Sequence, residues 1–402
     1  MNKENNKGVK KPKDENNIHY KNALMKKKQQ IEEKRKKKEQ EQLIKGISQE
    51  EINETNYYFE NGLRRVLPYF YIFKVNAKGR WIGRTIVDVF VNEFKLCNEE
   101  TTIKKIEKGL IKINNKLIDP STIIHHHDEI EHQVHRHEPP VYCDKLTIVK
   151  ETNDFIAIDK PSSVPVHPCG RYRHNTVIFI LSHEGYPNLR PVHRLDRMTS
   201  GILLLAKTIQ AAREFQNHMV IKKKEYICRV RGKLEKTVVT SKIGRKRIDD
   251  KKIHVSVNKI EEDGKECCSE FNPLFYDEKT NTTVAVALLG SGRTHQLRVH
   301  LQSIHHPIVN DPIYAAQFDE SKCDDEGIFE TQYGGTIQWK IEEGCIECEH
   351  LKGDPIQYGI YLHAWRYIVD DEIFETKLPY WAQPNVDISQ EIDEFNKNHI
   401  LI

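Results

Sequence analysis

The 402-residue chain has no uninterrupted apolar run that approaches the ~18–20 residues needed to cross a bilayer. Its opening stretch, MNKENNKGVKKPKDENN, lacks the apolar centre of a secretory signal, and its acidic residues disfavour a mitochondrial transit peptide. Neither a P-loop nor a dinucleotide-binding fingerprint occurs, which argues against a nucleotide cofactor. These absences predict an intracellular protein that does not enter a membrane, with cytoplasm, nucleus and mitochondrion all open as its compartment.

Cysteine is scarce and odd in number. The nine cysteines are scattered along the chain, which is typical of reduced thiols rather than of a disulfide framework. With 16 Pro and 20 Gly, collagen-like and linker-dominated chains are excluded. Hydrophobic residues make up 38% of the chain and charged residues 30%. The chain is therefore polar, but it is long enough for a sizeable core and for two or three domains.

The positive charge gathers at one end of the chain. Residues 1–50 hold 15 Lys and Arg against 8 Asp and Glu, whereas the net charge of the whole chain is only +3. The segment KKKQQIEEKRKKKEQEQLIKG is nearly devoid of apolar residues, so a helix there would have no face to bury. This pattern predicts a disordered Lys-rich tail. A solvated tail and a tail that attracts RNA or directs nuclear import both fit it.

Residues 81–137 look like a small separate module. An apolar stretch over 86–94 predicts a first helix, and Ile103 and Ile106, three residues apart, predict a second. LIKINNKLI reads as a hairpin that turns at two asparagines. This order, with the stretch Gly109–Ile118, resembles the αα-turn-β RNA-binding module named after a ribosomal small-subunit protein. We expect a basic RNA-binding surface formed by Lys104, Lys105 and Lys108.

Two stretches suggest a metal site, although weakly. HHHDEIEHQVHRH at 125–137 is rich in His, but adjacent residues point different ways, while metal ligands must converge on one ion. IEHQVH reads instead as a half-buried strand. Cys345-x-x-Cys348 resembles half of a zinc site that Cys323 and His350 would complete, but one such pair without a clean second pair is weak. We expect no metal and leave zinc at Cys345 and Cys348 open.

Residues 140–385 are predicted to form the main domain. Short β-rich segments alternate with a few helical patterns, which predicts an α+β fold with a mixed, largely antiparallel sheet. Residues 232–266 and 316–356 are polar and read as insertions. The expected strands are 146–151, 155–159, 201–207, 225–231, 252–257, 282–289 and 359–367, and the expected helices are 175–184, 209–219 and 294–304.

Two charged clusters in this domain lie next to apolar strands. In the first, Arg194 and Arg197 flank Asp196 just before ILLLAK, and they favour the ionised carboxylate. An ionised carboxylate can act as a nucleophile or a general base, although a salt bridge within the loop also explains the cluster. In the second, Arg293 follows two glycines after TTVAVALL, and Thr294 is expected to cap the next helix. An arginine in that turn can pair with a carboxylate or a phosphate.

Together these clusters resemble the RluA-type pseudouridine synthase family. H-R-L-D-x-x-T-S-G is complete at 193–201, and G-R-T-H-Q-L-R-x-H is complete at 292–300. K-x-Y-x-A-x-V occurs at 224–230 with Cys228 in place of Ala. The resemblance covers roughly 140–380, and the small module extends it to about 80. VHPCGRYRHNTVIFIL and RHEPPV resemble the eukaryotic branch that acts on tRNA and mRNA, and no zinc-deaminase signature accompanies them.

The resemblance implies an isomerase that needs no cofactor. Asp196 would be the essential catalytic carboxylate, and whether it attacks the sugar or the base, or removes a sugar proton, stays open. Arg293 would pair with Asp196, Tyr226 would stack on the uracil, and Arg194 would fill the space left by the flipped nucleotide. The expected partner is RNA, with a tRNA anticodon stem-loop favoured over mRNA, and the chain is expected to be a monomer. The alternative is an RNA-binding protein or RNA chaperone without activity.

Overall fold

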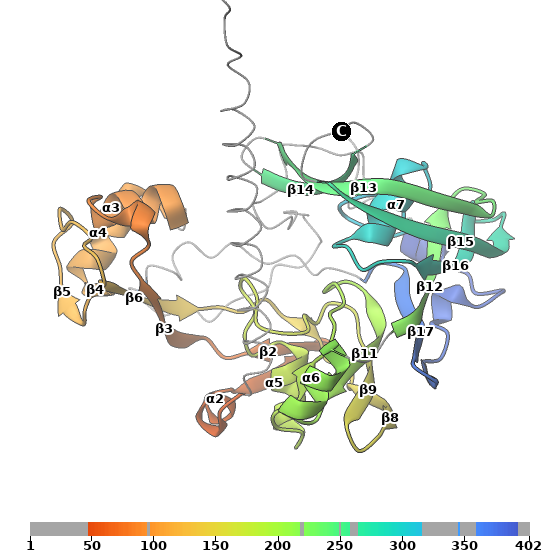
Figure 1. The fold of residues 1–402 in the computed structure, drawn as a ribbon, viewed down its shortest axis with the longest axis horizontal. Helices are drawn as coiled ribbons and strands as arrows, with labels where there is room; N and C mark the ends of the chain where they lie inside the picture. The colour runs from red at the N-terminus through yellow and green to blue at the C-terminus, as the bar shows by residue number, and fades with distance from the viewer. Residues whose placement is uncertain are drawn as a thin grey trace, which may run out of the picture.

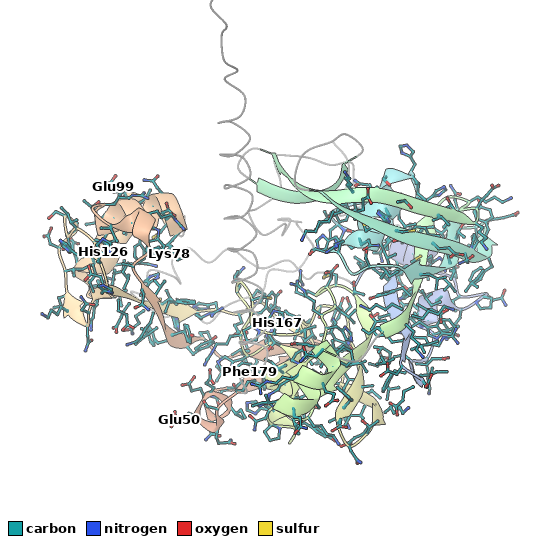
Figure 2. The ribbon with its side chains drawn as sticks, in the orientation of Figure 1. Glu50, Lys78, Glu99, His126, His167 and Phe179 are labelled. Atoms are coloured by element: carbon teal, nitrogen blue, oxygen red, sulfur yellow. The ribbon has the colours of Figure 1, made fainter. Side chains whose placement is uncertain are left out.

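The structure is a computed structural model that places a small body and a large body on either side of a two-stranded ribbon (Figure 1). The small body and the ribbon comprise residues 69–136, and the large body comprises the described residues from 137 onward together with 47–68. Lys78, Glu99 and His126 lie on the small body, whereas Glu50, His167 and Phe179 lie on the large body (Figure 2). The residues that the structure describes are 47–94, 97–217, 221–248, 251–257, 264–315, 345 and 359–392.

The small body contains the helices and the hairpin predicted for it. The first helical segment is α3 (Ile86–Val89), continued by the π-helical turn η2 (Phe90–Phe94), and the second is α4 (Glu99–Glu107). Asn114 and Asn115 have φ values of 53° and 61°, which a tight hairpin turn requires. The four-stranded sheet has the order β3-β6-β4-β5, from β3 (Tyr69–Asn76), β6 (Glu129–Arg136), β4 (Ile111–Ile113) and β5 (Lys116–Leu117).

The small body has its own core, because helices and sheet each bury one apolar face against the other. Trp81, Phe90 and Ile130 are almost fully buried there. Residues 69–76, for which the sequence predicts no element, form β3 and pair along the whole of β6. A second small sheet, in the order β1-β2-β7, lies at the ribbon's base and consists of β1 (Tyr57–Glu60), β2 (Leu63–Val66) and β7 (Val141–Tyr142).

The large body confirms the predicted α+β class with a mixed, largely antiparallel sheet. Apart from the parallel pair β11–β17, its described strands pair antiparallel. The order is β14-β13-β15-β16-β12-β17-β11-β9-β8. The bounds are β8 (Thr147–Glu151), β9 (Phe155–Lys160), β10 (Arg190–Pro191), β11 (Ser200–Ala206), β12 (Ile221–Arg231), β13 (Thr237–Ile248), β14 (Lys251–Val257), β15 (Lys265–Asp277), β16 (Thr282–Leu289), β17 (Leu362–Val369) and β18 (Glu372–Glu375).

Helices cover the sheet where the sequence patterns place them. They are α5 (Val177–His183), α6 (Ile209–Asn217) and α7 (Gln296–Ser303), and the short α2 (Gln49–Asn53) precedes β1. The apolar strands of the sheet supply the main core, with Ile158, Leu203 and Ile227 fully buried. Among the described residues, no helix is both long enough and apolar enough to cross a membrane.

The two predicted insertions fare differently. Within the first, 232–266, which is predicted as a polar insertion with a strand at 252–257, β13 and β14 pair with each other and extend the edge of the large sheet. The segment is polar, but its backbone can form strands because β15 offers hydrogen-bond partners for β13. The second, 316–356, lies outside the described residues except for Cys345, and so does the Lys-rich tail except for its last four residues.

Candidate active site

The loop that carries Asp196 connects β10 to β11, and Lys160 at the end of β9 forms a hydrogen bond to it. The Thr199 amide donates to the Asp196 carbonyl at 3.1 Å, which closes a turn. Lys160 is fully buried, and its ammonium donates to the carbonyls of Pro161, Val164 and Arg197 at 2.8, 2.9 and 3.2 Å. Burial, with the charge of Arg197, lowers the pKa of Lys160 to about 7. The lysine thus fixes the backbone one residue beyond Asp196.

We predict that Lys160→Met loosens this loop. The change leaves buried carbonyl groups without a donor, which should lower the free energy of unfolding by about 1–3 kcal/mol. Urea denaturation measures that loss, and initial rates at saturating RNA should fall with it. Lys207→Met, which removes a half-buried lysine bonded to the Thr152 carbonyl on the same sheet, is the control. A Lys160→Met protein with wild-type stability and rate would contradict this role.

β11 starts where it can approach β17 closely. Gly201 has φ 108°, and a Cβ there would lie 2.1 Å from the Ala364 carbonyl oxygen, so only glycine fits. One residue earlier, the Ser200 hydroxyl lies 2.8 Å from Nδ1 of His363 on β17. The S-G of the first motif therefore joins the Asp196 loop to the strand beside Tyr226, which explains the spacing of that motif.

Asp196 lies in a partly enclosed, positively charged environment. Its Oδ2 is 3.7 Å from Nη1 of Arg298 and 3.7 Å from Nε2 of His295. Burial by itself would raise the pKa of Asp196, but the charges of His295 and Arg298, followed by Arg194 and Lys160, outweigh it and lower the pKa below the ordinary value. The carboxylate is therefore ionised at neutral pH, as a nucleophile or general base must be.

Arg298 is itself fixed by a buried carboxylate. Its Nε and Nη2 donate to the two oxygens of Asp311 at 2.7 and 2.9 Å, and the Arg298 and Asp311 side chains are 3% and 0% exposed. The planar guanidinium can present two edges at once, so Nη1 remains directed at Asp196. The ring centre of Tyr314 lies 5.0 Å from this guanidinium, and the Tyr314 hydroxyl lies 3.0 Å from Nδ1 of His295. Tyr314 thus contacts both of the side chains that lie near Asp196.

The predicted pairing of Arg293 with Asp196 is wrong in this structure. Among the described residues, the cationic groups within ion-pair distance of Asp196 are those of Arg298 and His295, and Arg293 is exposed. The reason is the turn before α7. The Gln296 side chain accepts from the Ser291 hydroxyl at 2.8 Å and from the Arg293 amide at 3.1 Å. This bend leaves the Arg293 side chain at the surface.

The capping prediction at this turn is also wrong. His295, not Thr294, is the N-cap of α7, with φ 56° and without a side-chain capping bond. This left-handed conformation reverses the chain just before the helix. Since α7 then starts at Gln296, Arg298 lies in its first turn, beside Asp196. Arg298 belongs to the predicted helix 294–304, but its pairing with Asp196 is not predicted from the sequence. The signal that was available is Asp311, an acidic residue following the helix that can hold an arginine.

Tyr226 lies on β12 beside Tyr367 of β17. The two hydroxyl oxygens are 2.5 Å apart, and burial raises the pKa of Tyr226 well above its ordinary value. The charge of Asp196 raises it further, which places the phenol within the field of that carboxylate. His193, whose ring centroid is 5.1 Å from that of Tyr367, has its pKa lowered to about 3 by burial and by the charge of Lys224. The side chains of Tyr226 and His193 are therefore uncharged at neutral pH.

Arg194 and the predicted lysines differ in exposure. Arg194 is exposed in the Asp196 loop, where a wedge into RNA would have to be, so this role stays a prediction. Lys104 on α4 and Lys108 at its C-cap are exposed, and Lys104 is paired with Glu100 at 2.8 Å. Lys105 is 6% exposed, and its Nζ lies 3.5 Å from Nε2 of His132. The expected three-lysine surface is therefore wrong at Lys105, because position 105 lies on the buried face of α4.

We predict that Lys104→Ala combined with Lys108→Ala reduces the salt dependence of RNA binding. Each exposed lysine that contacts a phosphate releases a counterion, so the slope of log affinity against log salt should fall by up to about two. The rate at saturating RNA should change little, since Asp196 and Tyr226 are untouched. Binding at several salt concentrations measures the slope, and Lys222→Ala on the large body is the control. An unchanged slope would mean that this face of α4 does not contact RNA.

The stretches suggested for a metal come together only in part. IEHQVH forms a strand as predicted, within β6. Nδ1 of His135 lies 3.2 Å from Nε2 of His137 and 3.3 Å from Sγ of Cys345. Over the part of the chain that the structure describes, no three His, Cys, Asp or Glu side chains are arranged to hold an ion. Cys323, Cys348 and His350 lie outside those residues.

Comparison with known proteins agrees with this arrangement. Residues 154–303 match the model of the family described as RNA pseudouridylate synthase. Pseudouridylate synthase RPUSD2 of Mus musculus is 42% identical over 271 residues, which are 66% of this chain and 48% of that protein. Two Saccharomyces cerevisiae proteins align over more of their length. The tRNA pseudouridine(32) synthase, mitochondrial, is 34% identical over 80% of this chain and 77% of its own, and the tRNA pseudouridine(31) synthase is 32% identical over 81% and 97%.

The chain therefore belongs to the RNA pseudouridylate synthase family, which confirms the family predicted from its three motifs. Its relatives in mouse and yeast agree with the predicted eukaryotic branch. The chain spans about half the length of the mouse and human RPUSD2 proteins, 48% in each case.

Proposed function

We propose that this protein isomerises uridine to pseudouridine in RNA. The observation that carries the proposal is the ionised Asp196 carboxylate, held 3.7 Å from Arg298 and His295 beside the buried ring of Tyr226. The reaction breaks the bond between C1′ of the ribose and N1 of uracil, turns the base, and joins C1′ to C5. The proton lost from C5 is replaced by one at N1, so atoms and electrons balance. No cofactor is needed.

Each of these residues has one task in the proposed reaction. Asp196 supplies the carboxylate, whether it attacks the sugar or the base or removes a sugar proton. Arg298 keeps Asp196 ionised and in place. Tyr226 supports the uracil, and the uncharged rings of Tyr226 and Tyr367 together exclude water from the base. A uridine stacked in a stem cannot reach this loop, so the target nucleotide is flipped out, and the exposed Arg194 fills its place.

We infer that the substrate is tRNA and that the target lies in the anticodon stem-loop. The support is that two relatives from Saccharomyces cerevisiae are named for positions 31 and 32 of tRNA. The exposed Arg293 beside the site is available to contact RNA phosphate in the complex. Action as a monomer is part of the proposal. Intracellular placement is part of the proposal, and one relative is named as mitochondrial.

Pseudouridine mapping after incubation with defined RNAs tests the proposal. The full chain should modify a tRNA anticodon stem-loop transcript in the absence of any added cofactor, and an mRNA fragment of equal length should be modified more slowly. A folded protein that binds these RNAs but produces no pseudouridine in either would favour the alternative, an RNA-binding protein without activity. Size-exclusion chromatography and imaging of a tagged chain in cells would establish the oligomeric state and the compartment.

A further inference from the structure

Aromatic rings and arginines form a continuous strip from the ribbon to the Asp196 loop. The strip consists of Tyr71 and Phe73 on β3, Arg136 on β6, Tyr172, and Arg197. The guanidinium of Arg136 lies 5.6 Å from the ring centre of Tyr71 and 5.5 Å from that of Phe73. At the other end, the guanidinium of Arg197 lies 5.5 Å from the ring centre of Tyr172.

One hydrogen bond joins the two ends of the strip. Nη2 of Arg136 donates to the carbonyl of Gly170 at 3.0 Å, and Gly170 belongs to the exposed loop that precedes Tyr172. His167, just before this loop, lies where the ribbon reaches the large body (Figure 2). Arg197 follows Asp196 directly. This hydrogen bond and the backbone from Gly170 to the buried Tyr172 therefore link the middle of the ribbon to the residue next to the proposed catalytic carboxylate.

The strip occupies one face of the ribbon only. Side chains alternate along β3, so Tyr71 and Phe73 share a face, while Phe70 and Ile72 lie on the opposite face. Phe73, Phe70 and Ile72 are 43%, 56% and 47% exposed. The opposite face is equally apolar, but there Phe70 stacks on His135 and the Arg136 guanidinium is absent. One face of β3, with Phe73, is thus the candidate surface, and the opposite face, with Phe70, provides a matched control.

The ribbon is anchored where the strip crosses to the large body. The carboxylate of Glu138, 1% exposed, accepts from the amides of Arg173, His174 and Asn175, each at 2.9 Å, and from the hydroxyl of Tyr69 at 2.6 Å. Arg173 lies 4.8 Å from the ring centre of Tyr71. Ion pairs with α2 already occupy its guanidinium, so it supports this ring rather than offering a free charge. The strip is therefore held in place before any ligand binds.

We propose that the strip binds the RNA segment adjacent to the flipped uridine, with bases stacked on Phe73 and Tyr71 and phosphates near Arg136 and Arg197. Aromatic faces interleaved with arginines match unpaired RNA, because each base presents a π-face and each nucleotide a negative phosphate. No carboxylate among the described residues is ion-paired with Arg136, so its charge is available to a polyanion. This inference rests on the proposed function for its substrate. It adds which surface outside the pocket recognises that RNA.

Four variants of the full chain test the strip by fluorescence anisotropy with a labelled anticodon stem-loop RNA. Phe73→Ala should weaken binding at least about 5-fold, since a stacked base contributes ~1–3 kcal/mol. Phe73→Trp should restore binding, because it keeps a ring at that position. Arg136→Gln should lower the salt slope by about 0.7–0.9, as expected for one phosphate contact. Phe70→Ala, the control on the opposite face, should bind within about 2-fold of wild type, since it is not on the strip.

The melting temperature of each variant shows whether it is folded. If Phe73→Ala and Phe70→Ala are folded and bind RNA alike, the proposal is overturned. Turnover is measured separately and separates the two proposals. A wild-type protein that makes no pseudouridine but loses RNA affinity in Phe73→Ala would refute the proposed function and support the strip. An active protein whose Michaelis constant is unchanged by Phe73→Ala would refute the strip alone.

Discussion

Asp196→Asn is expected to abolish pseudouridine formation, with at least about a 10³-fold loss of rate at saturating RNA. An amide is neither a competent nucleophile nor a base, and the carboxylate here is held ionised by Arg298 and His295. RNA affinity should stay within a few-fold of wild type, because the contacts proposed to position RNA lie on basic and aromatic surfaces outside this carboxylate. Single-turnover assays with excess protein, together with binding measurements on the same preparation, give both numbers.

The matched control is Asp371→Asn, which removes an almost fully exposed carboxylate paired with Lys222 on the same body. This variant should react and bind like wild type. An Asp196→Asn protein that turns over at a rate near wild type would show that the essential carboxylate lies elsewhere. If instead Asp196→Asn lost RNA binding as severely as it lost the rate, Asp196 would be acting on affinity rather than on chemistry.

Arg298→Lys is expected to lower the rate at saturating RNA about 10²-fold, the cost of a misplacement of about 1 Å in a catalytic group. Lysine keeps the charge, but its single ammonium cannot form the two hydrogen bonds to Asp311 and also face Asp196. The pH profile carries a second signature. Burial raises the pKa of Asp196 and nearby cations lower it, so weakening one cation raises that pKa, and the acidic limb of the profile should move to higher pH.

Arg293→Lys is the comparison that decides between the two arginines. Because Arg293 is exposed and Arg298 is the arginine paired with Asp196, the acidic limb should stay in place in the Arg293 variant even if the Michaelis constant rises. A limb that moves in Arg293→Lys and not in Arg298→Lys would restore the pairing expected from the sequence. Arg298→Met provides a further check. It leaves Asp311 buried without its cation, which should cost about 3–5 kcal/mol of unfolding free energy, measured in urea.

Local patterns in the sequence led to most of the site. Asp196 and Tyr226 were predicted because each belongs to a short motif that resembles one of a known family, and such a motif keeps its residues together wherever its strand or loop lies. Arg298 was missed as a partner for a different reason. Its distance from Asp196 depends on the left-handed His295, on the start of α7 one residue later than expected, and on Asp311 beyond the helix. None of these is encoded by spacing within the motif alone.

Surface predictions depended even more on packing. The pattern Lys104, Lys105 and Lys108 looks uniformly basic in sequence, yet α4 turns Lys105 toward His132 and leaves the other two exposed. Similarly, 232–266 is predicted as a polar insertion with a strand at 252–257, whereas the pairing of β13 on β15 and of β14 on β13 is set by the assembled sheet. Which face of a helix is buried and which sheet edge is free are properties of the assembled fold, so the identity and spacing of residues alone do not predict them.

The sequence by itself determined the family, the α+β class, the hairpin at two asparagines and the identity of the candidate carboxylate. The family and the candidate carboxylate follow from the resemblance of three motifs to a known family, whereas the α+β class and the hairpin follow from local rules, since alternation and turn chemistry act over a few residues. Only the tertiary structure decided which arginine faces Asp196, that Lys160 supports its loop, and that the ribbon carries aromatic rings toward it. Those relations join residues about 40 to more than 100 positions apart in the chain. Long-range packing sets such distances, and neighbouring residues in the chain do not.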